Sequence, residues 1–321
     1  MGDNDTTEQD TTGQDTTVAR VEANGIEVNV ATAGRGPAVL LLHGWPHTWR
    51  LWTQVIPALA SNHRVIAPDL RGLGDSTRTT SGYDAGTLAA DAAALLDALG
   101  ESSAAVVAID AGAPAAFLLA LTQPERVQRL VLMEALLPIA SDPAGVWPAG
   151  PPWWFGFHAV PDLAETVLVG HEGQYLDYFL TSGSLGRGIE PAVRDAFVAA
   201  YSGKEALRAG FEFYRAARDN AAQLSAAVTT PTTARLRMPT MAIGAHPVGA
   251  ALHRQLEPIS DDLTGHVLQD CGHVIPLDRP RPLLDLLEPF LAPSRRPSPG
   301  RAPDRHGRAG RLPSSSTGES S

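Results

Sequence analysis

The sequence predicts an α/β fold, in which a mostly parallel sheet is covered by helices on both faces. Short apolar runs of strand length alternate with helical patterns along the chain, which is typical of such sheets. Several runs are apolar throughout, as expected for strands buried on both faces. From Pro138 to about Thr233 the strand pattern stops and helical patterns replace it. This segment is therefore predicted to be a helical cap inserted between two strands.

The predicted strands are short apolar runs, with helices between most of them. Asp84 to Leu99 carries apolar residues at helical spacing and precedes Gly100, a typical residue after a helix end. Residues 115–121 are also helical in pattern. We expect strands at Ile26–Ala31, Ala38–Leu42, Val65–Ala67, Ala104–Ile109, Leu130–Met133, Thr240–Ile243 and Gly265–Leu268.

Composition separates a folded part from two polar ends. Residues 1–17 form a Thr, Asp, Gln and Gly tract, and residues 293–321 are rich in Pro, Ser, Arg and Gly. Neither end offers enough apolar surface to fold, so both are predicted to be disordered tails. The sheet-bearing core is predicted at 18–137 and 234–292, and the cap at 138–233.

Bulk properties exclude several classes of function. The 321 residues are 44% hydrophobic, enough for a large core, and carry a formal charge of −10 with Lys204 as the only lysine. Because phosphate binding needs clustered cations, no nucleic-acid partner is expected. Nothing resembles a membrane span or a signal peptide, so we expect no membrane partner and a cytoplasmic location. The lone Cys271 has no disulfide partner. A small uncharged substrate fits best, and a homodimer stays open.

Asp110 is the first candidate for chemistry. It lies in a turn between the apolar run Ala104–Ile109 and a helical stretch, with the small residues Ala108 and Gly112 two positions to either side. A sharp strand-to-helix turn that displays a nucleophile needs such small neighbours. The alternative is that Asp110 caps the following helix.

A second turn is predicted to supply an oxyanion hole. The apolar run that ends at Leu42 continues as His43-Gly44-Trp45-Pro46. Its turn can direct the backbone N–H of Trp45 to the space above Asp110, where the Ala111 N–H also points. Two such donors would stabilise a developing oxyanion. His43-Gly44 can equally be an ordinary tight turn.

A histidine and an acid complete a candidate triad. His273 follows Gly272 just beyond a predicted strand, where it can take a proton from water. Glu134 ends the strand Leu130–Met133 and can orient and charge-stabilise that histidine. The alternatives are a structural role for His273 and a capping role for Glu134 at the cap junction.

These motifs resemble those of the epoxide hydrolases of the α/β-hydrolase fold, which are related to haloalkane and fluoroacetate dehalogenases. The likeness covers nearly all of 18–292 and includes the His-Gly-x-Pro motif at His43–Pro46 and the loop Ala67–Ser76. It implies that Asp110, where many hydrolases have serine, is the nucleophile and that His273 activates water. Glu134, 24 residues beyond Asp110, matches the acid of one subgroup. The other acid position, near His246, has no nearby carboxylate.

The resemblance also implies two cap donors that polarise the epoxide oxygen. Tyr214 matches the tyrosine, but the usual histidine is replaced in the run Pro152-Trp153-Trp154. An indole N–H is a donor, so Trp154, together with Trp153, can share this task, unless both only line the pocket. The implied reaction opens an epoxide to a vicinal diol through an Asp110 ester that His273-activated water cleaves.

Three alternatives stay open. A dehalogenase is the first, since Trp153 and Trp154 could hold a halide, although Ala111 stands where haloalkane enzymes have tryptophan. The second is a hydrolase-fold protein that binds a ligand without catalysing a reaction, and the third is an esterase-like or cyclising enzyme. Aromatic residues favour an aromatic or polycyclic epoxide, natural products included; the expected pocket residues are Trp45, Trp147, Phe155 and Phe157. No metal or cofactor is expected. His43 and His47 have a spacing that could hold a metal ion on one face of a helix, but Pro46 would interrupt such a helix.

Overall fold

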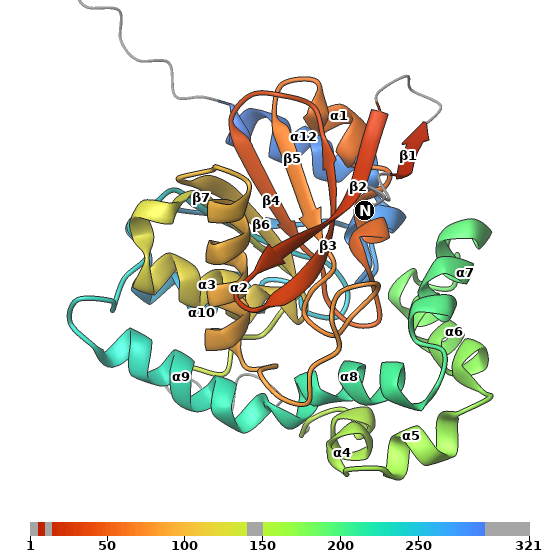
Figure 1. The fold of residues 1–321 in the computed structure, drawn as a ribbon. Coiled ribbons are helices and arrows are strands. Elements are labelled where there is room, and N and C mark those ends of the chain that lie inside the picture. The colour runs from red at the N-terminus through yellow and green to blue at the C-terminus, as the bar shows by residue number, and fades with distance from the viewer. Residues whose placement is uncertain (1–5, 10–14, 140–149, 293–321) are drawn as a thin grey trace, which may run out of the picture. The chain divides into compact units, whose positions relative to one another are not determined.

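One nine-stranded sheet forms the centre of the computed structural model, which describes residues 6–9, 15–139 and 150–292 (Figure 1). The strand order is β1-β2-β3-β5-β4-β6-β7-β8-β9. The pairs β1·β2, β2·β3 and β3·β5 are antiparallel, and the remaining pairs are parallel. The strands are β1 (Thr6–Gln9), β2 (Asp15–Ala23), β3 (Ile26–Ala33), β4 (Ala38–Leu42), β5 (Arg64–Pro68), β6 (Ala104–Ile109), β7 (Val127–Met133), β8 (Thr240–Gly244) and β9 (Leu263–Val267).

All seven predicted strands are confirmed, with ends shifted by no more than three residues. The N-terminal prediction differs, because β1 and the first residues of β2 lie within 1–17. β2 pairs with β3 through a two-residue turn at Asn24 and Gly25, whose φ angles are +48° and +74°. Asn-Gly is the favoured sequence of this hairpin turn and was the available signal. The 293–321 prediction lies outside the described residues.

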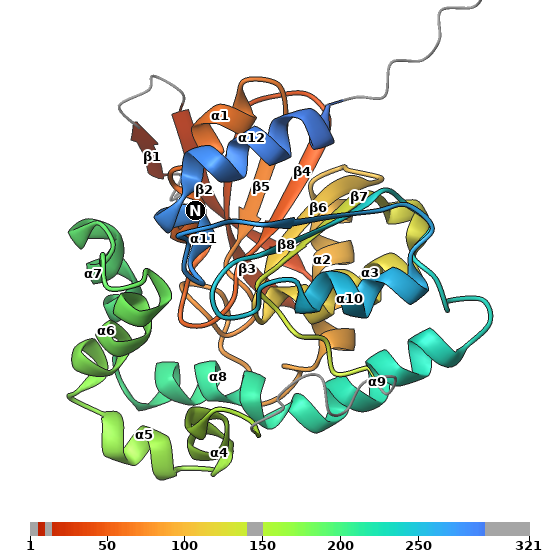
Figure 2. The same cartoon turned by 180° about the vertical axis from the view of Figure 1, so that it is seen from behind.

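Helices cover both faces of the sheet. α2 (Ala85–Ala98) and α3 (Gly112–Thr122) cover one face (Figure 1), and α1 (Ile56–Ala60) and α12 (Pro280–Leu291) cover the other (Figure 2). The predicted helix at Asp84–Leu99 is confirmed as α2. α10 (Ala251–Leu256) and α11 (Ile275–Asp278) flank β9, and short 3-10 turns lie at Trp49–Trp52, Pro124–Arg126 and Glu257–Ile259.

Between β7 and β8 the described residues form helices and no strand, as the sequence predicted; we call this segment, 150–230, the helical insertion. Most of its helices lie below the sheet in Figures 1 and 2, and the helices within 172–200 lie beside its lower part, on the right in Figure 1 and on the left in Figure 2. They are α4 (Trp153–Ala159), α5 (Leu163–Leu168), α6 (Glu172–Gly183), α7 (Pro191–Ala200), α8 (Lys204–Arg215) and α9 (Ala217–Thr229). That the segment is a separate cap domain stays a prediction.

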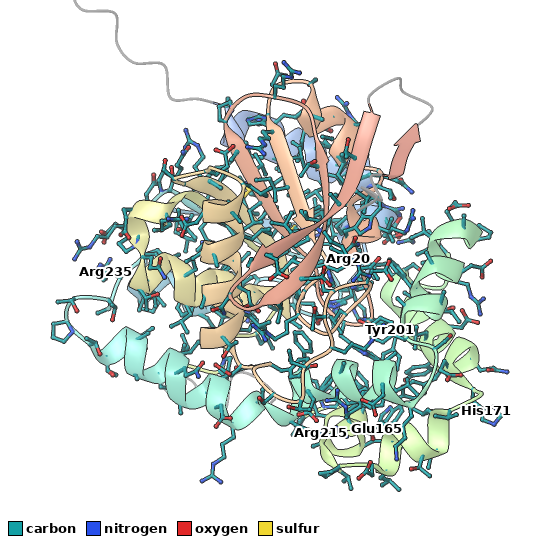
Figure 3. All side chains as sticks on the ribbon, viewed as in Figure 1. Arg20, Glu165, His171, Tyr201, Arg215 and Arg235 are labelled. Atoms are coloured by element: carbon teal, nitrogen blue, oxygen red, sulfur yellow. The ribbon has the colours of Figure 1, made fainter. Side chains whose placement is uncertain are left out.

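Buried polar contacts hold the helical insertion together and tie it to the core. Arg215 Nη2 donates to Oε1 of the buried Glu165 at 2.7 Å, which joins α8 to α5 (Figure 3). The Tyr201 hydroxyl donates to the His47 carbonyl at 3.2 Å. Asn220 of α9 accepts the Ala85 N–H at 2.7 Å, so that α9 caps the first turn of α2.

The sheet interior explains why its strands are so apolar. β4 and β6 are buried at every residue, because helices cover both faces. The described residues up to Leu291 form one compact unit. No helix in the described ranges is long and apolar enough to cross a membrane.

Candidate active site

Asp110 lies in a tight turn between β6 and α3. Its φ of +53° is in the left-handed region, which is unusual for a residue with a side chain. The neighbouring backbone approaches closely: a Cβ on Gly112 would lie 2.5 Å from the His43 carbonyl oxygen, and one on Gly44 only 2.2 Å from Asp110 Oδ1. The turn therefore requires glycine at both positions.

The two carboxylate oxygens of Asp110 face different partners. Oδ1 accepts the Trp45 backbone N–H at 2.9 Å, and Oδ2 lies 3.2 Å from His273 Nε2. The N-cap residue of α3 is Ala111, with no side-chain capping bond, so Asp110 does not cap this helix. Its side chain instead points to the base and to the predicted oxyanion donor.

Glu134 holds the other side of the histidine. His273 Nδ1 lies 3.1 Å from Glu134 Oε2, and Glu134 Oε1 accepts the Ala245 N–H. Glu134 is 1% exposed and, like Asp110, has a left-handed φ, here +42°. The end of β8 thus contributes an N–H that anchors Glu134. The structure brings Asp110, His273 and Glu134 into one hydrogen-bonded chain.

The charges of this chain support one another. Burial alone would lower the pKa of His273, but its hydrogen bonds to Asp110 and Glu134, and their charges, raise it to about 10. Burial alone would raise the pKa of Asp110. The interactions with His273 and with the Ala111 N–H outweigh burial, so the pKa of Asp110 is lowered. At neutral pH the resting pair is an aspartate and an imidazolium.

His43 stabilises the turn after β4 and is not placed to transfer a proton. Its Nδ1 donates to the Gly44 carbonyl at 2.8 Å and its Nε2 accepts the Leu70 N–H at 3.0 Å. Both ring nitrogens are therefore occupied by backbone groups. Burial lowers its pKa to about 4, which keeps the ring neutral.

Aromatic side chains of the helical insertion cover Trp45. The Tyr214 ring lies 5.6 Å from that of Trp45 and 5.1 Å from that of Phe155, between ring centroids. Burial raises the pKa of Tyr214 well above its usual value, and the charge of Asp110 adds to this effect. Tyr214 is thus an un-ionised O–H donor, close enough to Asp110 for the charge of the carboxylate to act on its pKa. Trp154 packs against Phe179 at 5.5 Å.

Two of the predicted aromatic residues are not placed at the triad. Trp153 is 55% exposed, and its ring contacts Tyr178 and Phe157 at 6.0 and 6.2 Å. It therefore faces outward, and no contact joins it to Asp110 in the described structure. Phe157 packs with it and with Tyr175. Trp147 lies outside the described residues.

Sequence reasoning missed one buried polar pair in the aromatic cluster. His158 is fully buried, and its Nε2 lies 2.6 Å from the Tyr175 hydroxyl. Its ring stacks on Phe211 at 4.2 Å and contacts Tyr214 at 4.4 Å. Burial lowers its pKa to about 3. No sequence signal pairs residues from different helices in this way.

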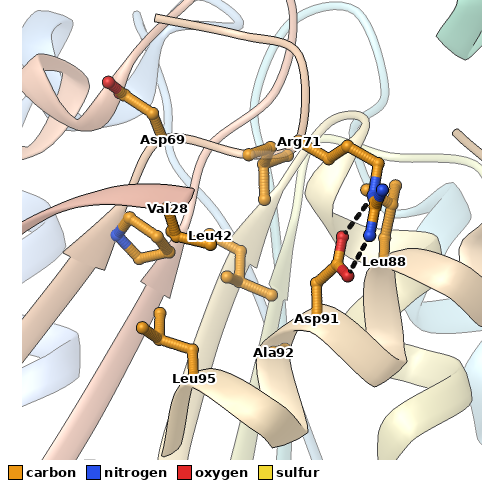
Figure 4. A pocket seen from close by; sticks show the side chains of 10 residues that line it. Val28, Leu42, Asp69, Arg71, Leu88, Asp91, Ala92 and Leu95 are labelled. Atoms are coloured by element: carbon orange, nitrogen blue, oxygen red, sulfur yellow. Dashed lines mark hydrogen bonds and ion pairs between the residues drawn. The ribbon is translucent and has the colours of Figure 1, made fainter. Parts of the chain in front are cut away.

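A small cavity elsewhere in the core is not a substrate site. It lies between the sheet and α2 and has a volume of about 20 Å³ (Figure 4), which is room for roughly one water. Arg71 crosses it and pairs with Asp91 through two bonds of 2.7 and 2.6 Å. This ion pair fixes the loop after β5 to α2.

Comparison with known proteins agrees with the fold. Residues 37–280 match the family described as alpha/beta hydrolase fold. The chain belongs to the α/β-hydrolase fold family, which makes it one of the hydrolases of this fold. Within the family its relatives include enzymes named as epoxide hydrolases, and the resemblance inferred from the motifs is confirmed.

Three relatives cover nearly the whole chain. A soluble epoxide hydrolase from Corynebacterium sp. (strain C12) is 32% identical over 281 residues, which are 85% of this chain and 96% of that protein. The crystal structure of Cfl2 from Burkholderia cenocepacia is 31% identical with a TM-score of 0.79, over 90% of this chain and 100% of that one. The ligand-free structure of the epoxide hydrolase CorEH is 29% identical with a TM-score of 0.76, over 87% and 100%.

Proposed function

We propose that this protein is a cofactor-independent epoxide hydrolase that uses Asp110 as a covalent nucleophile. The observation that carries the proposal is the chain Asp110, His273 and Glu134, in which Asp110 Oδ2 faces the base and Oδ1 is held by the Trp45 N–H. The likeness to proteins named epoxide hydrolase supports the same reaction.

In the first step Asp110 Oδ2 attacks a ring carbon of the epoxide. A carbon–Oδ2 bond forms, the ring carbon–oxygen bond breaks, and the departing oxygen takes a proton from Tyr214. The buried Tyr214 suits this role because its raised pKa keeps the proton on the hydroxyl until a stronger base forms. An alkoxide is such a base.

Ester formation itself prepares His273 for the second step. The resting imidazolium is held by two carboxylates, and esterification removes the charge of one of them. The pKa of His273 must then fall, so its proton can pass through solvent to the Tyr214 phenolate. Neutral His273 then takes a proton from water, hydroxide adds to the Asp110 carbonyl carbon, and the tetrahedral intermediate collapses by breaking its bond to Oδ2. The departing alkoxide takes the proton of the new carboxyl group, which leaves the diol, the Asp110 carboxylate and the His273 imidazolium.

The oxyanion of the second step would form at Oδ1. That atom already accepts the Trp45 N–H at 2.9 Å, and the Ala111 N–H also stabilises the carboxylate. Donors that are in place before the reaction need no rearrangement during it. We therefore assign Trp45 and Ala111 as the oxyanion hole.

Trp154 is proposed as the second donor to the epoxide oxygen, with Tyr214 as the first. The outward-facing Trp153 has no part in this scheme. The Tyr214 ring packs against the rings of Trp45 and Phe155, so an aromatic or polycyclic epoxide is the proposed substrate class. A cytoplasmic location and a homodimer stay predictions.

A panel of aromatic epoxides and alkyl halides tests the reaction class. We expect diol from one or more epoxides, no halide release, and no activity in Asp110→Asn, because an amide is a poor nucleophile. Halide release abolished by the same substitution would identify a dehalogenase instead. Diol formation that survives Asp110→Asn would refute a covalent role for this residue.

A further inference from the structure

An ion pair between the helical insertion and the core contacts the loop that carries His273. Arg187, between α6 and α7, donates from Nε to Asp278 Oδ1 at 2.8 Å and from Nη2 to Asp278 Oδ2 at 2.6 Å. This two-bond geometry fixes direction as well as distance. The Asp278 side chain is only 2% exposed, and Arg187 is its two-bond partner, while Arg279 Nη1 lies farther away, at 3.8 Å from Oδ1.

Asp278 connects Arg187 to Gly272, the residue before His273. Its Oδ2 accepts the Gly272 N–H at 2.7 Å, and Gly272 directly precedes His273. The same arginine also reaches Asp270, through an Nη1 bond of 3.2 Å to Oδ1 and an Nη2 bond of 3.1 Å to the carbonyl. Arg187 thus holds the loop at two points before His273.

The backbone of the helical insertion supports the other side of the loop. The Val274 N–H donates to the Gly183 carbonyl at 3.0 Å, so the residue after His273 is also fixed. A Cβ on Gly272 would lie 2.1 Å from that same carbonyl oxygen, which shows how closely the two segments pack. His273 is held from both neighbours by residues 183–187.

We propose that Arg187 is a positioning residue for His273, acting through Asp278 and the Gly272 N–H, and that it serves mainly the hydrolysis of the ester. The inference rests on the proposed function. In ester formation His273 transfers no proton to the substrate, whereas in hydrolysis its Nε2 must reach a water beside the Asp110 carbonyl carbon. A displaced imidazole therefore slows the second step more than the first.

The test resolves the two steps in Arg187→Met. The full-length enzyme is mixed with excess styrene oxide, or the best epoxide of the panel, and quenched at intervals, and the esterified fraction is read by intact mass. We expect ester hydrolysis to slow by roughly 10- to 100-fold, as for a catalytic group moved by about 1 Å. Ester formation should change far less, so ester accumulates and kcat falls with KM.

Arg194→Met is the matched control. Arg194 of α7 makes a two-bond pair with Asp177 of α6, at 2.8 and 2.8 Å, and its side chain is 33% exposed against 35% for Arg187. It does not touch the His273 loop, so its loss should change neither step by more than about twofold. Arg187→Lys should recover part of the hydrolysis rate and replaces the Met variant if that one folds poorly, because lysine keeps the charge without the paired geometry.

Two results would overturn the inference: unchanged ester hydrolysis in Arg187→Met, or equal slowing of both steps. If the wild type forms no ester on any epoxide, the proposed function fails separately. The ¹⁵N shifts of the His273 imidazole then decide the positioning role, because Arg187→Met should alter them and Arg194→Met should not. Identical spectra for both variants and the wild type would refute it.

Discussion

At the scale of single residues, the proposed triad of Asp110, His273 and Glu134 contains two carboxylate residues whose backbone conformation is uncommon. Asp110 and Glu134 follow adjacent parallel strands and both have positive φ. Such conformations cost about 1–3 kcal/mol each and persist where the surroundings fix them. Here they direct both side chains to His273, and the bonds from Trp45 N–H and Ala245 N–H hold them there.

Tyr214→Phe should slow ester formation. The substitution removes the Tyr214 hydroxyl but keeps the ring contacts. The rate of ester formation should fall by roughly 10- to 1000-fold, the scale found for loss of one oxyanion donor. Tyr178→Phe, at an exposed tyrosine of α6, is the control. Ester formation followed by intact mass decides: equal rates in the two variants would remove Tyr214 from the mechanism.

The pKa of His273 should fall in Asp110→Asn. One of the two carboxylates that raise it to about 10 is then neutral. A raised pKa stabilises the fold fully below the unfolded value of about 6.5, and this contribution is lost as pH rises through the folded value. The stabilisation that His273 gives to the fold should therefore be lost at a lower pH in Asp110→Asn than in the wild type. NMR titration of His273 gives both values, and an unchanged pKa would contradict the proposed ion pair.

At the scale of elements, the β6–α3 connection leaves no room for a side chain at Gly112. Gly112→Ala places a methyl group 2.5 Å from the His43 carbonyl oxygen and should destabilise the protein by about 1–3 kcal/mol or more. Gly156→Ala is the control, because nothing lies within 4 Å of its Cβ position in α4. Urea unfolding measures both, and equal stability of the two variants would contradict the close packing described.

Elements with a local signal could be predicted from the sequence, and those defined by pairing could not. β4 and β6 match their predicted ranges because a run of apolar residues marks a strand buried on both faces. β2 was missed because Asp15-Thr-Thr and Arg20 make it polar, as an antiparallel strand near a sheet edge can be. Its partner β3, and not its own composition, fixes it.

At the scale of the whole molecule, the meeting of Asp110, Glu134 and His273 was predictable from the sequence, and the surroundings of these residues were not. Asp110, Glu134 and His273 each follow a strand, so a parallel sheet brings them to one edge. The pairing of Arg187 with Asp278 joins residues 91 apart that no periodicity links. The outward position of Trp153 depends on how α4 rotates against α6, which sequence order does not determine.

Prolonged dialysis against EDTA should leave diol formation unchanged. In the proposed mechanism Asp110 is the nucleophile, His273 is the base and backbone N–H groups form the oxyanion hole, so a protein group fills each chemical role. Steady-state rates before and after dialysis check this. Activity that is lost and then restored by an added metal ion would contradict the proposed mechanism.

The most direct test of the covalent mechanism is the intact mass of His273→Gln mixed with a reactive aromatic epoxide. Without the base, the ester should form and persist, so the protein should gain the mass of one whole epoxide. The gain should be absent in the double variant with Asp110→Asn. No adduct on an epoxide that the wild type converts to diol, or an adduct that survives Asp110→Asn, would contradict the account.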